Sequence, residues 1–217
     1  MVDPFQLDPS RPLIICDADE VLVQFMAGLE RYLHTKGLYH DFSSFRIHGN
    51  VRDQNSNDRV SDTLVDDLFS QFFATQTRGL DPVPGAATAL KALSQYAQIL
   101  ILSNLPASAR DARIANLSDH GMAYPVIAGS GPKGVVIKSL LQDFQQPVVF
   151  VDDLPPHHIS VAAETPHVHR LHFVADPRLA KLIGACPQAH QRLDTWPEAE
   201  PWIRSRLQDA KHERPPR

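Results

Sequence analysis

Cysteine is scarce in this sequence, and the usual signals of a secreted or membrane-bound protein are missing. The 217 residues include two cysteines, Cys16 and Cys186, which excludes a disulfide framework and allows at most one bridge. No apolar run approaches the roughly 18 residues of a membrane-spanning helix, so we expect no membrane span. Residues 1–8 contain neither a basic nor an apolar stretch of the kind found in secretion signals. We therefore expect no export and a cytoplasmic location.

The sequence also lacks a large excess of charge of either sign. Its 21 Lys and Arg residues against 25 Asp and Glu residues give a formal net charge of −4 at pH 7. Proteins that hold nucleic acid or an anionic membrane usually do so through a basic surface, so we expect neither partner. Apolar residues make up 43% of the chain, which is enough for a globular core. The length suits one domain with an insertion, or two small domains.

Short apolar runs alternate with helical patterns along most of the chain. The runs are residues 13–16, 99–102, 126–128 and 148–151, with a less distinct fifth at 171–174. Continuously apolar runs of this length are typical of strands buried on both faces of a parallel sheet. Helical patterns lie at residues 86–94, 108–117, 135–141 and 159–163, and a last helix is expected near residue 197. This alternation predicts an α/β fold with a doubly wound parallel sheet.

The alternation is interrupted between residue 24 and about residue 79. Apolar residues recur there at helical spacing, first at 25–33 and again at 64–73, where Ser61 is the expected cap. The sequence therefore predicts a small helical insertion, without a strand, directly after the first strand. The polar loop at 46–59 is either a solvated connection or a specificity surface over an active site.

Acidic residues stand at the carboxyl ends of two predicted strands. Asp17 and Asp19 follow the first run, and Asp152 and Asp153 follow the fourth. Ligands bind open parallel sheets at this edge. Carboxylates beside buried strand ends lose hydration and repel one another unless a cation holds them together. Because Mg²⁺ accepts a few carboxylate oxygens and keeps water or phosphate oxygens in its other positions, these residues indicate a Mg²⁺ site.

The strand ends also match four motifs in a known order. Residues 13–21, Leu-Ile-Ile-Cys-Asp-Ala-Asp-Glu-Val, resemble the first motif of the haloacid dehalogenase (HAD) superfamily. Residues 100–104, Leu-Ile-Leu-Ser-Asn, are similar to its second motif, Lys133 with Gly134 to its third, and residues 149–153, Val-Phe-Val-Asp-Asp, to its fourth. The resemblance implies a Rossmann-like core domain at residues 1–23 and 80–217, and a small α-helical cap domain at residues 24–79.

The resemblance implies a catalytic role for the residues of the first three motifs. Asp17 would be the nucleophile that attacks phosphorus. Asp19 would protonate the leaving oxygen and then take a proton from water. Ser103 and the backbone N–H of Asn104 would hydrogen-bond a phosphoryl oxygen, and Lys133 would hold the phosphoryl group and Asp17.

The resemblance also assigns the metal ligands. Asp17 and the backbone carbonyl of Asp19 would bind Mg²⁺. Asp152 would bind it directly, and Asp153 would bind through water or orient Lys133. Many members of the family carry a Gly-Asp form of the fourth motif, which is absent here. Either aspartate therefore remains a candidate for the direct ligand. Lys138, five residues further along, is the alternative to Lys133 as the motif lysine.

Two further groups of residues are candidates for binding. The polar loop of the insertion offers Arg46, Arg52 and Arg59 as contacts to the anionic tail of a small phosphorylated substrate. Histidines are concentrated near the last motif, which raises the alternative of a transition-metal site. Alternation along a strand would place His167 and His169 on one side but His172 on the other, so we expect ordinary surface or core histidines. The histidines concerned are His157, His158, His167, His169 and His172.

The pattern as a whole predicts a Mg²⁺-dependent phosphatase that hydrolyses phosphomonoesters through an aspartyl-phosphate intermediate. Asp19 favours this activity, because dehalogenases of the superfamily lack an acid at this place. A phosphomutase keeps both aspartates and is one alternative. A catalytically silent binding protein with the same fold is another. The sequence carries no signal for an oligomeric state.

Overall fold

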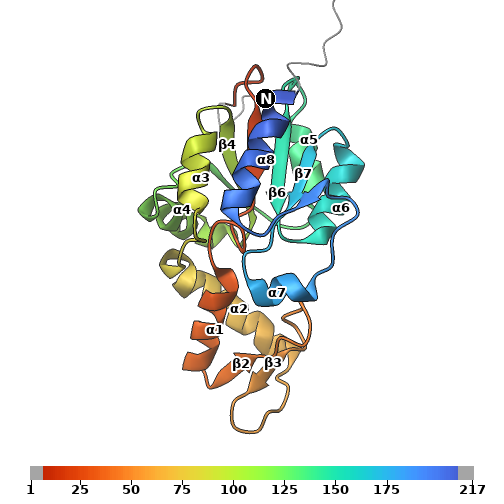
Figure 1. The fold of residues 1–217 in the computed structure, drawn as a ribbon. Helices are drawn as coiled ribbons and strands as arrows, with labels where there is room; N and C mark the ends of the chain where they lie inside the picture. Colours follow the sequence, from red (N-terminus) through yellow and green to blue (C-terminus); the bar gives the residue numbers. More distant parts are fainter. Residues whose placement is uncertain (1–6, 210–217) are drawn as a thin grey trace, which may run out of the picture.

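A six-stranded sheet forms the centre of the molecule (Figure 1). The computed structural model describes residues 7–209, so the ends of the predicted core domain, residues 1–6 and 210–217, lie outside the described part. Each pair of neighbouring strands is parallel, and their spatial order is β5-β4-β1-β6-β7-β8. The strands are β1 (Leu13–Cys16), β4 (Gln98–Asn104), β5 (Val126–Gly129), β6 (Val148–Asp152), β7 (His169–His172) and β8 (Gln191–Arg192).

Both faces of this sheet are covered by helices, as the apolar runs predict. Along β1, Leu13 and Ile15 join one hydrophobic cluster with α5 and α6, while Ile14 and Cys16 join the other with α3, α4 and α8. All four side chains are fully buried. The α/β fold class expected from the sequence is therefore confirmed. The helices are α3 (Ala86–Leu93), α4 (Arg110–Asp119), α5 (Lys133–Leu140), α6 (Pro155–Glu164), α7 (Pro177–Leu182) and α8 (Trp196–Asp209), with a 3-10 turn, η2, at Ala107–Ala109.

The second half of the core departs from the expected boundaries. Strand β7 spans His169–His172, two residues earlier at both ends than the predicted run 171–174, and beyond it the N–H of Val174 bonds to the side chain of Asp194 rather than to a neighbouring strand. Helix α6 begins at Pro155, four residues earlier than predicted, since proline suits the first turn of a helix. Strand β8 and helix α7 are too short to leave a periodic pattern, and the sequence did not predict them.

The insertion after β1 is not purely helical, which corrects the sequence prediction. A short antiparallel pair, β2 and β3, stands between its two helices, with Tyr39 opposite Arg52. Strands of three residues are too short to show a recognisable alternation. Ser61 caps the second helix as expected, because its Oγ accepts the N–H of Leu64 at 3.2 Å. The elements are α1 (Phe25–Thr35), β2 (Leu38–His40), β3 (Val51–Asp53), α2 (Asp62–Gln76) and a 3-10 turn, η1, at Thr77–Gly79.

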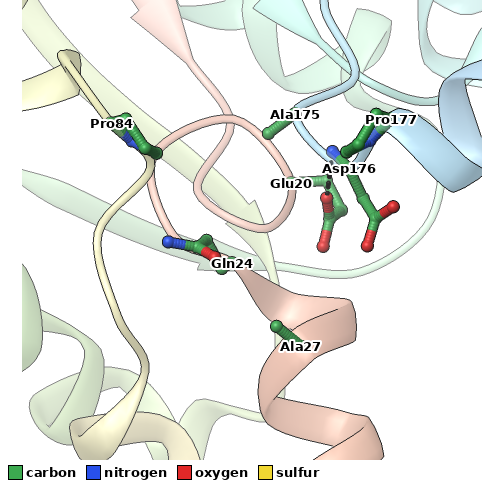
Figure 2. Close-up of a pocket in the computed structure, with 7 residues that line it drawn as sticks. All are labelled: Glu20, Gln24, Ala27, Pro84, Ala175, Asp176 and Pro177. Carbon is green, nitrogen blue, oxygen red and sulfur yellow. Dashed lines mark hydrogen bonds between the residues drawn. The ribbon is translucent and has the colours of Figure 1, made fainter.

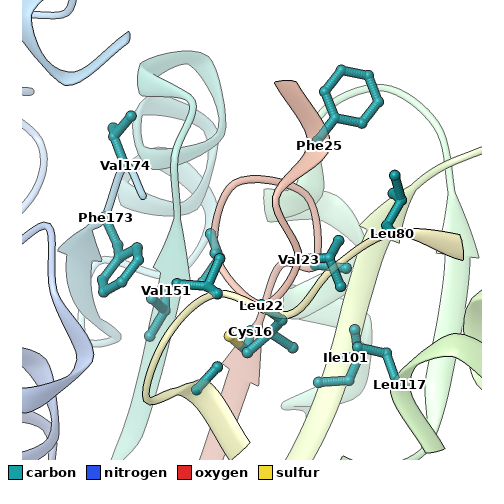
Figure 3. Close-up of a cluster of buried hydrophobic side chains, with 14 of the residues drawn as sticks. Cys16, Leu22, Val23, Phe25, Leu80, Ile101, Leu117, Val151, Phe173 and Val174 are labelled. Carbon is teal, nitrogen blue, oxygen red and sulfur yellow. The ribbon is translucent and has the colours of Figure 1, made fainter. Parts of the chain in front are cut away.

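The insertion packs onto the core at the edge where β1 ends (Figure 1). Figure 3 shows Leu22, Val23 and Leu80, from the two connections between core and insertion, in one cluster with Cys16 of β1 and Ile101 of β4. This shared hydrophobic cluster holds the insertion over the carboxyl ends of the strands.

Among residues 7–209, no helix combines the length and apolar character needed to cross a membrane.

Candidate active site

Three buried carboxylates meet at the carboxyl edge of the sheet. Strands β1 and β6 are parallel neighbours with Cys16 opposite Val151, so the residues that follow the two strands lie side by side. One carboxylate oxygen from each of Asp17, Asp152 and Asp153 lies within 4.8 Å of the others. The juxtaposition of the first and fourth motifs is therefore a direct result of strand order.

Lys133 lies between two of these carboxylates. Its Nζ is 2.9 Å from Oδ1 of Asp17 and 2.6 Å from Oδ2 of Asp152, and the side chain is 1% exposed. Burial disfavours the charged ammonium, but the two carboxylates outweigh this and raise the pKa of Lys133 above its ordinary value. Lys138 is exposed and pairs with Glu164 instead. Of the two candidate lysines, Lys133 is the one that the structure places in the cluster.

The cluster fits a divalent metal ion. The cluster contains three carboxylates and one ammonium group, which leaves an excess of negative charge in a buried place. Burial raises the pKa of Asp17 and, more strongly, that of Asp153, so the ionised forms are disfavoured without a further cation. The ligands are all oxygens, which is the donor set that Mg²⁺ prefers. The ion pairs of Lys133 are with Asp17 and Asp152, and the expectation that Asp153 binds the metal through water or orients this lysine stays a prediction.

Asp19 is paired with an arginine that the sequence did not single out. Nη2 of Arg113, on α4, lies 2.5 Å from Oδ1 of Asp19, and the arginine side chain is fully buried. Burial raises the pKa of Asp19, while the guanidinium opposes this increase. An arginine 94 residues away on an otherwise polar helix has no local pattern that marks it as a partner. Only the packing of α4 against the strand edge reveals it.

The second motif supplies an unpaired hydroxyl. Ser103, near the end of β4, is fully buried, and its Oγ has no hydrogen-bond partner. It is not the cap of a helix, because the next helical turn begins only at residue 107. Asn104 donates from Nδ2 to the carbonyl of Gly131 at 2.9 Å and lines the pocket described below. A buried hydroxyl without a partner is free to bind a ligand oxygen.

Two histidines support the backbone of the fourth motif. Nε2 of His158 lies 3.0 Å from the carbonyl of Asp152, and Nε2 of His172 lies 2.9 Å from the carbonyl of Asp153. Carbonyl oxygens only accept, so each Nε2 carries the proton. Burial lowers the pKa of both rings, to about 3 for His158, which keeps them neutral. These two are core histidines that position the acidic pair.

Glu20 connects this edge to two helices. Its carboxylate accepts the N–H of Met26 in the first turn of α1 at 2.6 Å and the N–H of Asp176, just before α7, at 3.0 Å. Figure 2 shows Glu20 and Asp176 side by side in a small pocket that also involves Gln24 of the connection to α1. Burial raises the pKa of Glu20 to about 7. This residue was not identified from the sequence, although it belongs to the first motif.

A cavity of about 190 Å³ opens from the carboxylates toward the insertion. Asp17, Asp19 and Asp153 line one part of it. Glu20, Asn104 and His157 also line it, and the rest of the lining is apolar, including Phe45 and Ile47 from the segment between β2 and β3.

The three arginines predicted to contact substrate do not line this cavity. Arg46 is exposed, Arg52 pairs with Asp41 at 3.0 Å, and Arg59 pairs with Asp62 at 2.9 Å. The expectation that they bind an anionic tail is therefore not supported by the structure. The polar loop does reach the cavity, but through the apolar side chain of Ile47.

Comparison with known proteins supports the fold. A HAD family hydrolase from Deinococcus radiodurans R1, solved with bound phosphate and sodium, is 17% identical, with 91% of this chain and 97% of that chain covered and a TM-score of 0.61. YfnB from Bacillus subtilis, assigned to the HAD hydrolases and bound to magnesium, is 10% identical, with coverages of 89% and 98% and a TM-score of 0.58. L-2-haloacid dehalogenase from Xanthobacter autotrophicus, with covalently bound chloropropionic acid, is 12% identical, with coverages of 88% and 98% and a TM-score of 0.55.

These similarities are at the level of structure. No protein-family model and no curated protein sequence matches the chain. The chain has the fold of the HAD-like hydrolases, as its four motifs predict. Because structures with this fold include a dehalogenase, the reaction has to be argued from the site itself.

Proposed function

We propose that this chain, with its HAD-like fold, is a Mg²⁺-dependent phosphatase that hydrolyses small phosphomonoesters through an aspartyl-phosphate intermediate. The observation that carries this proposal is that Lys133 lies between Asp17 and Asp152, while Asp17 and Asp19 line the same cavity. This arrangement supports Asp17 as the nucleophile, Lys133 as its cationic partner and Asp19 as the acid.

In the first step, a carboxylate oxygen of Asp17 attacks phosphorus, and the bond from phosphorus to the leaving oxygen breaks. Asp19 gives its proton to that oxygen, so the alcohol leaves neutral. The raised pKa of Asp19 favours the protonated form that this step needs. Lys133 orients the attacking carboxylate through its 2.9 Å contact.

In the second step, water attacks the phosphorus of the aspartyl phosphate. Asp19, now ionised, takes a proton from that water, and Arg113 stabilises the ionised form. The bond from phosphorus to the Asp17 oxygen breaks, which releases inorganic phosphate and regenerates the carboxylate. In both steps the unpaired hydroxyl of Ser103 would donate to a phosphoryl oxygen, with the backbone N–H of Asn104 beside it.

Asp17, Asp152 and Asp153, with the backbone carbonyl of Asp19, would hold Mg²⁺. When bound, this ion supplies the positive charge that offsets the repulsion between the carboxylates and an anionic ester.

The expected partner is a small phosphorylated molecule rather than nucleic acid or a membrane. Both cysteines are free and buried, which suits a reducing compartment, and we propose a cytoplasmic location.

The test is phosphate release from a broad panel of phosphate esters with Mg²⁺, by the wild type and the Asp17→Asn variant. We expect turnover in the wild type and none in the variant, because an amide cannot replace the carboxylate as nucleophile. Lys138→Met, which alters the exposed lysine of the same helix, is the matched control and should retain activity. Isomerisation of a phosphate ester that needs a bisphosphate activator, without net release of phosphate, would instead indicate a phosphomutase. Equal release by Asp17→Asn would contradict the mechanism.

A further inference from the structure

The cavity beside the acidic cluster has two chemically different parts. One part is formed by the carboxylates of Asp17, Asp19 and Asp153, where the phosphoryl group would lie in the proposed function. The other part is formed by apolar side chains from four separate segments of the chain. These side chains are Phe25 and Met26 of α1, Phe45 and Ile47 from the segment between β2 and β3, Phe73 of α2 and Leu179 of α7.

We propose that the physiological substrate carries an apolar leaving group of about the size of one ring, an aryl or a short alkyl alcohol, without a second anionic group. This inference rests on the proposed function and specifies its substrate class. The phosphoryl group would face the carboxylates and their metal ion, and the organic group would occupy the apolar part. Three properties of the cavity support this proposal: the packed aromatic side chains of its apolar part, the lack of lysine and arginine among the described residues of its lining, and its volume.

The apolar wall is part of a packed aromatic group. The rings of Phe25 and Phe73 lie 5.9 Å apart between centroids, and Phe25 also contacts the rings of Phe69 and Phe72 at 6.2 Å and 5.3 Å. Aromatic side chains packed in this way are held in place and present a preformed surface. A small apolar group that enters gains burial without having to order the wall first.

A second anionic group would find neither lysine nor arginine along the described lining of this part of the cavity. Among the described residues that line the cavity there is no lysine or arginine. Arg52 and Arg59, which lie in the same insertion, are held by Asp41 and Asp62. A carboxylate or second phosphate on the leaving group would therefore lose hydration without gaining a partner. Sugar bisphosphates and phosphorylated carboxylic acids do not fit this wall.

The volume sets an upper limit on the size of the leaving group. The cavity measures about 190 Å³ in total, and this includes the part beside the carboxylates where the phosphoryl group would lie. For comparison, an apolar cavity of about 150 Å³ accepts one benzene molecule. Pockets for larger organic ligands are usually about 300 to 1,000 Å³. One ring or a short alkyl chain is therefore the expected occupant.

Binding of phosphonates, which resist hydrolysis, tests the inference without relying on turnover. In the presence of Mg²⁺, calorimetry would compare benzylphosphonate with methylphosphonate and with phosphonoacetate. We expect benzylphosphonate to bind at least about tenfold more tightly than either, because only its ring fills the apolar part. Equal affinities, or tighter binding of phosphonoacetate, would overturn the proposal.

A variant with a cation on the apolar wall provides a second, independent test of the ligand preference. Ile47→Lys places a cation on the apolar wall, and we expect it to raise the affinity for phosphonoacetate relative to benzylphosphonate by about tenfold or more. Leu64→Lys, at an exposed position of α2 outside the cavity, is the matched control and should leave the ratio unchanged. Thermal unfolding verifies that both variants are folded. Phe45→Lys repeats the test if Ile47→Lys fails to fold, and an unchanged ratio in a folded variant contradicts the proposal.

Failure of this inference and failure of the proposed function are distinguishable. If benzylphosphonate binds preferentially but no ester of the panel is hydrolysed, the cavity assignment stands and the phosphatase proposal fails. If esters are hydrolysed but polar or anionic leaving groups are preferred in both turnover and binding, the phosphatase proposal stands and the substrate class is wrong.

Discussion

Arg113 and Asp19 form an ion pair at 2.5 Å between α4 and the loop after β1, and the arginine side chain is completely buried. Two opposing effects act on the pKa of Asp19, the proposed acid: burial raises this pKa, and the guanidinium lowers it. Replacing Arg113 by Met removes the lowering contribution, so the pKa of Asp19 should rise further, and the alkaline limb of the kcat profile, where the protonated acid is lost, should move to higher pH.

The same variant should also lose stability. Breaking a buried ion pair costs about 3 kcal/mol, which a urea titration measures. Arg31→Met, which breaks an exposed pair with Asp81, is the control and should cost less than about 1 kcal/mol. An unshifted pH profile in Arg113→Met would show that the arginine does not act on the proposed acid.

Removal of the metal ion should abolish the phosphatase activity reversibly. With EDTA we expect phosphate release to stop, and Mg²⁺ in excess should restore it, because the site offers only oxygen ligands. Ca²⁺ should restore little activity, since its longer bonds and higher coordination number displace the nucleophile. The melting temperature should rise on adding Mg²⁺ to the stripped protein. Restoration by zinc but not by Mg²⁺ would be incompatible with the assigned ligands.

His158 should make folding stability depend on pH. Its pKa falls to about 3 in the folded protein through burial, against an ordinary value of about 6.5. Below pH 6.5 the unfolded chain binds a proton that the folded chain does not, so stability is lost as pH falls, by at most about 1.4 kcal/mol per pH unit. His158→Gln keeps an N–H for the carbonyl of Asp152 but does not titrate. Urea unfolding at pH 7, 6 and 5 should therefore show a smaller loss in the variant than in the wild type. Identical slopes would exclude the histidine as the cause.

Gly134 allows α5 and α6 to approach closely. A Cβ at this position would overlap with the carbonyl oxygen and Oγ of Ser160, and the N–H of Gly134 already bonds that Oγ at 3.0 Å. We expect Gly134→Ala to lower the free energy of unfolding by about 1 to 3 kcal/mol and to displace Lys133, the adjacent residue. Gly79→Ala is the control, because nothing lies within 4 Å of its Cβ position. Equal stability of both variants would contradict this packing argument.

Arg178 links α7 to the insertion. It donates to Glu30 of α1 at 2.9 and 2.6 Å, pairs with Asp176, and lies 4.1 Å from the ring centre of Phe42. Because the pair is partly exposed, Arg178→Ala should cost only about 1 kcal/mol in stability. It should also weaken benzylphosphonate binding by about fivefold, because the next residue, Leu179, lines the cavity. Unchanged affinity would show that α7 holds its position without this arginine.

The sequence alone was sufficient for the fold class and for the acidic cluster. Continuously apolar runs predict buried parallel strands, and residues at the ends of neighbouring parallel strands must meet, so Asp17 and Asp152 were expected to lie together. The four motifs in order predict the HAD-like fold that the comparisons support.

Short elements escaped prediction for a different reason. Strands β2 and β3 have three residues each and α7 has six, so none shows a period long enough to recognise. Their formation depends on partners elsewhere in the chain, as in the contact of α7 with Glu30 through Arg178.

Side-chain partners at the site were decided by tertiary structure. A local pattern does not distinguish Lys133 from Lys138, but only the first is buried between carboxylates. Arg113 resembles any helix arginine until α4 packs beside Asp19. The segment between β2 and β3 supplies Phe45 and Ile47 to the cavity, whereas Arg52 and Arg59 pair with carboxylates of the insertion. Backbone periodicity is a local property that one sequence records, whereas the direction and pairing of a long charged side chain depend on groups that only folding brings near.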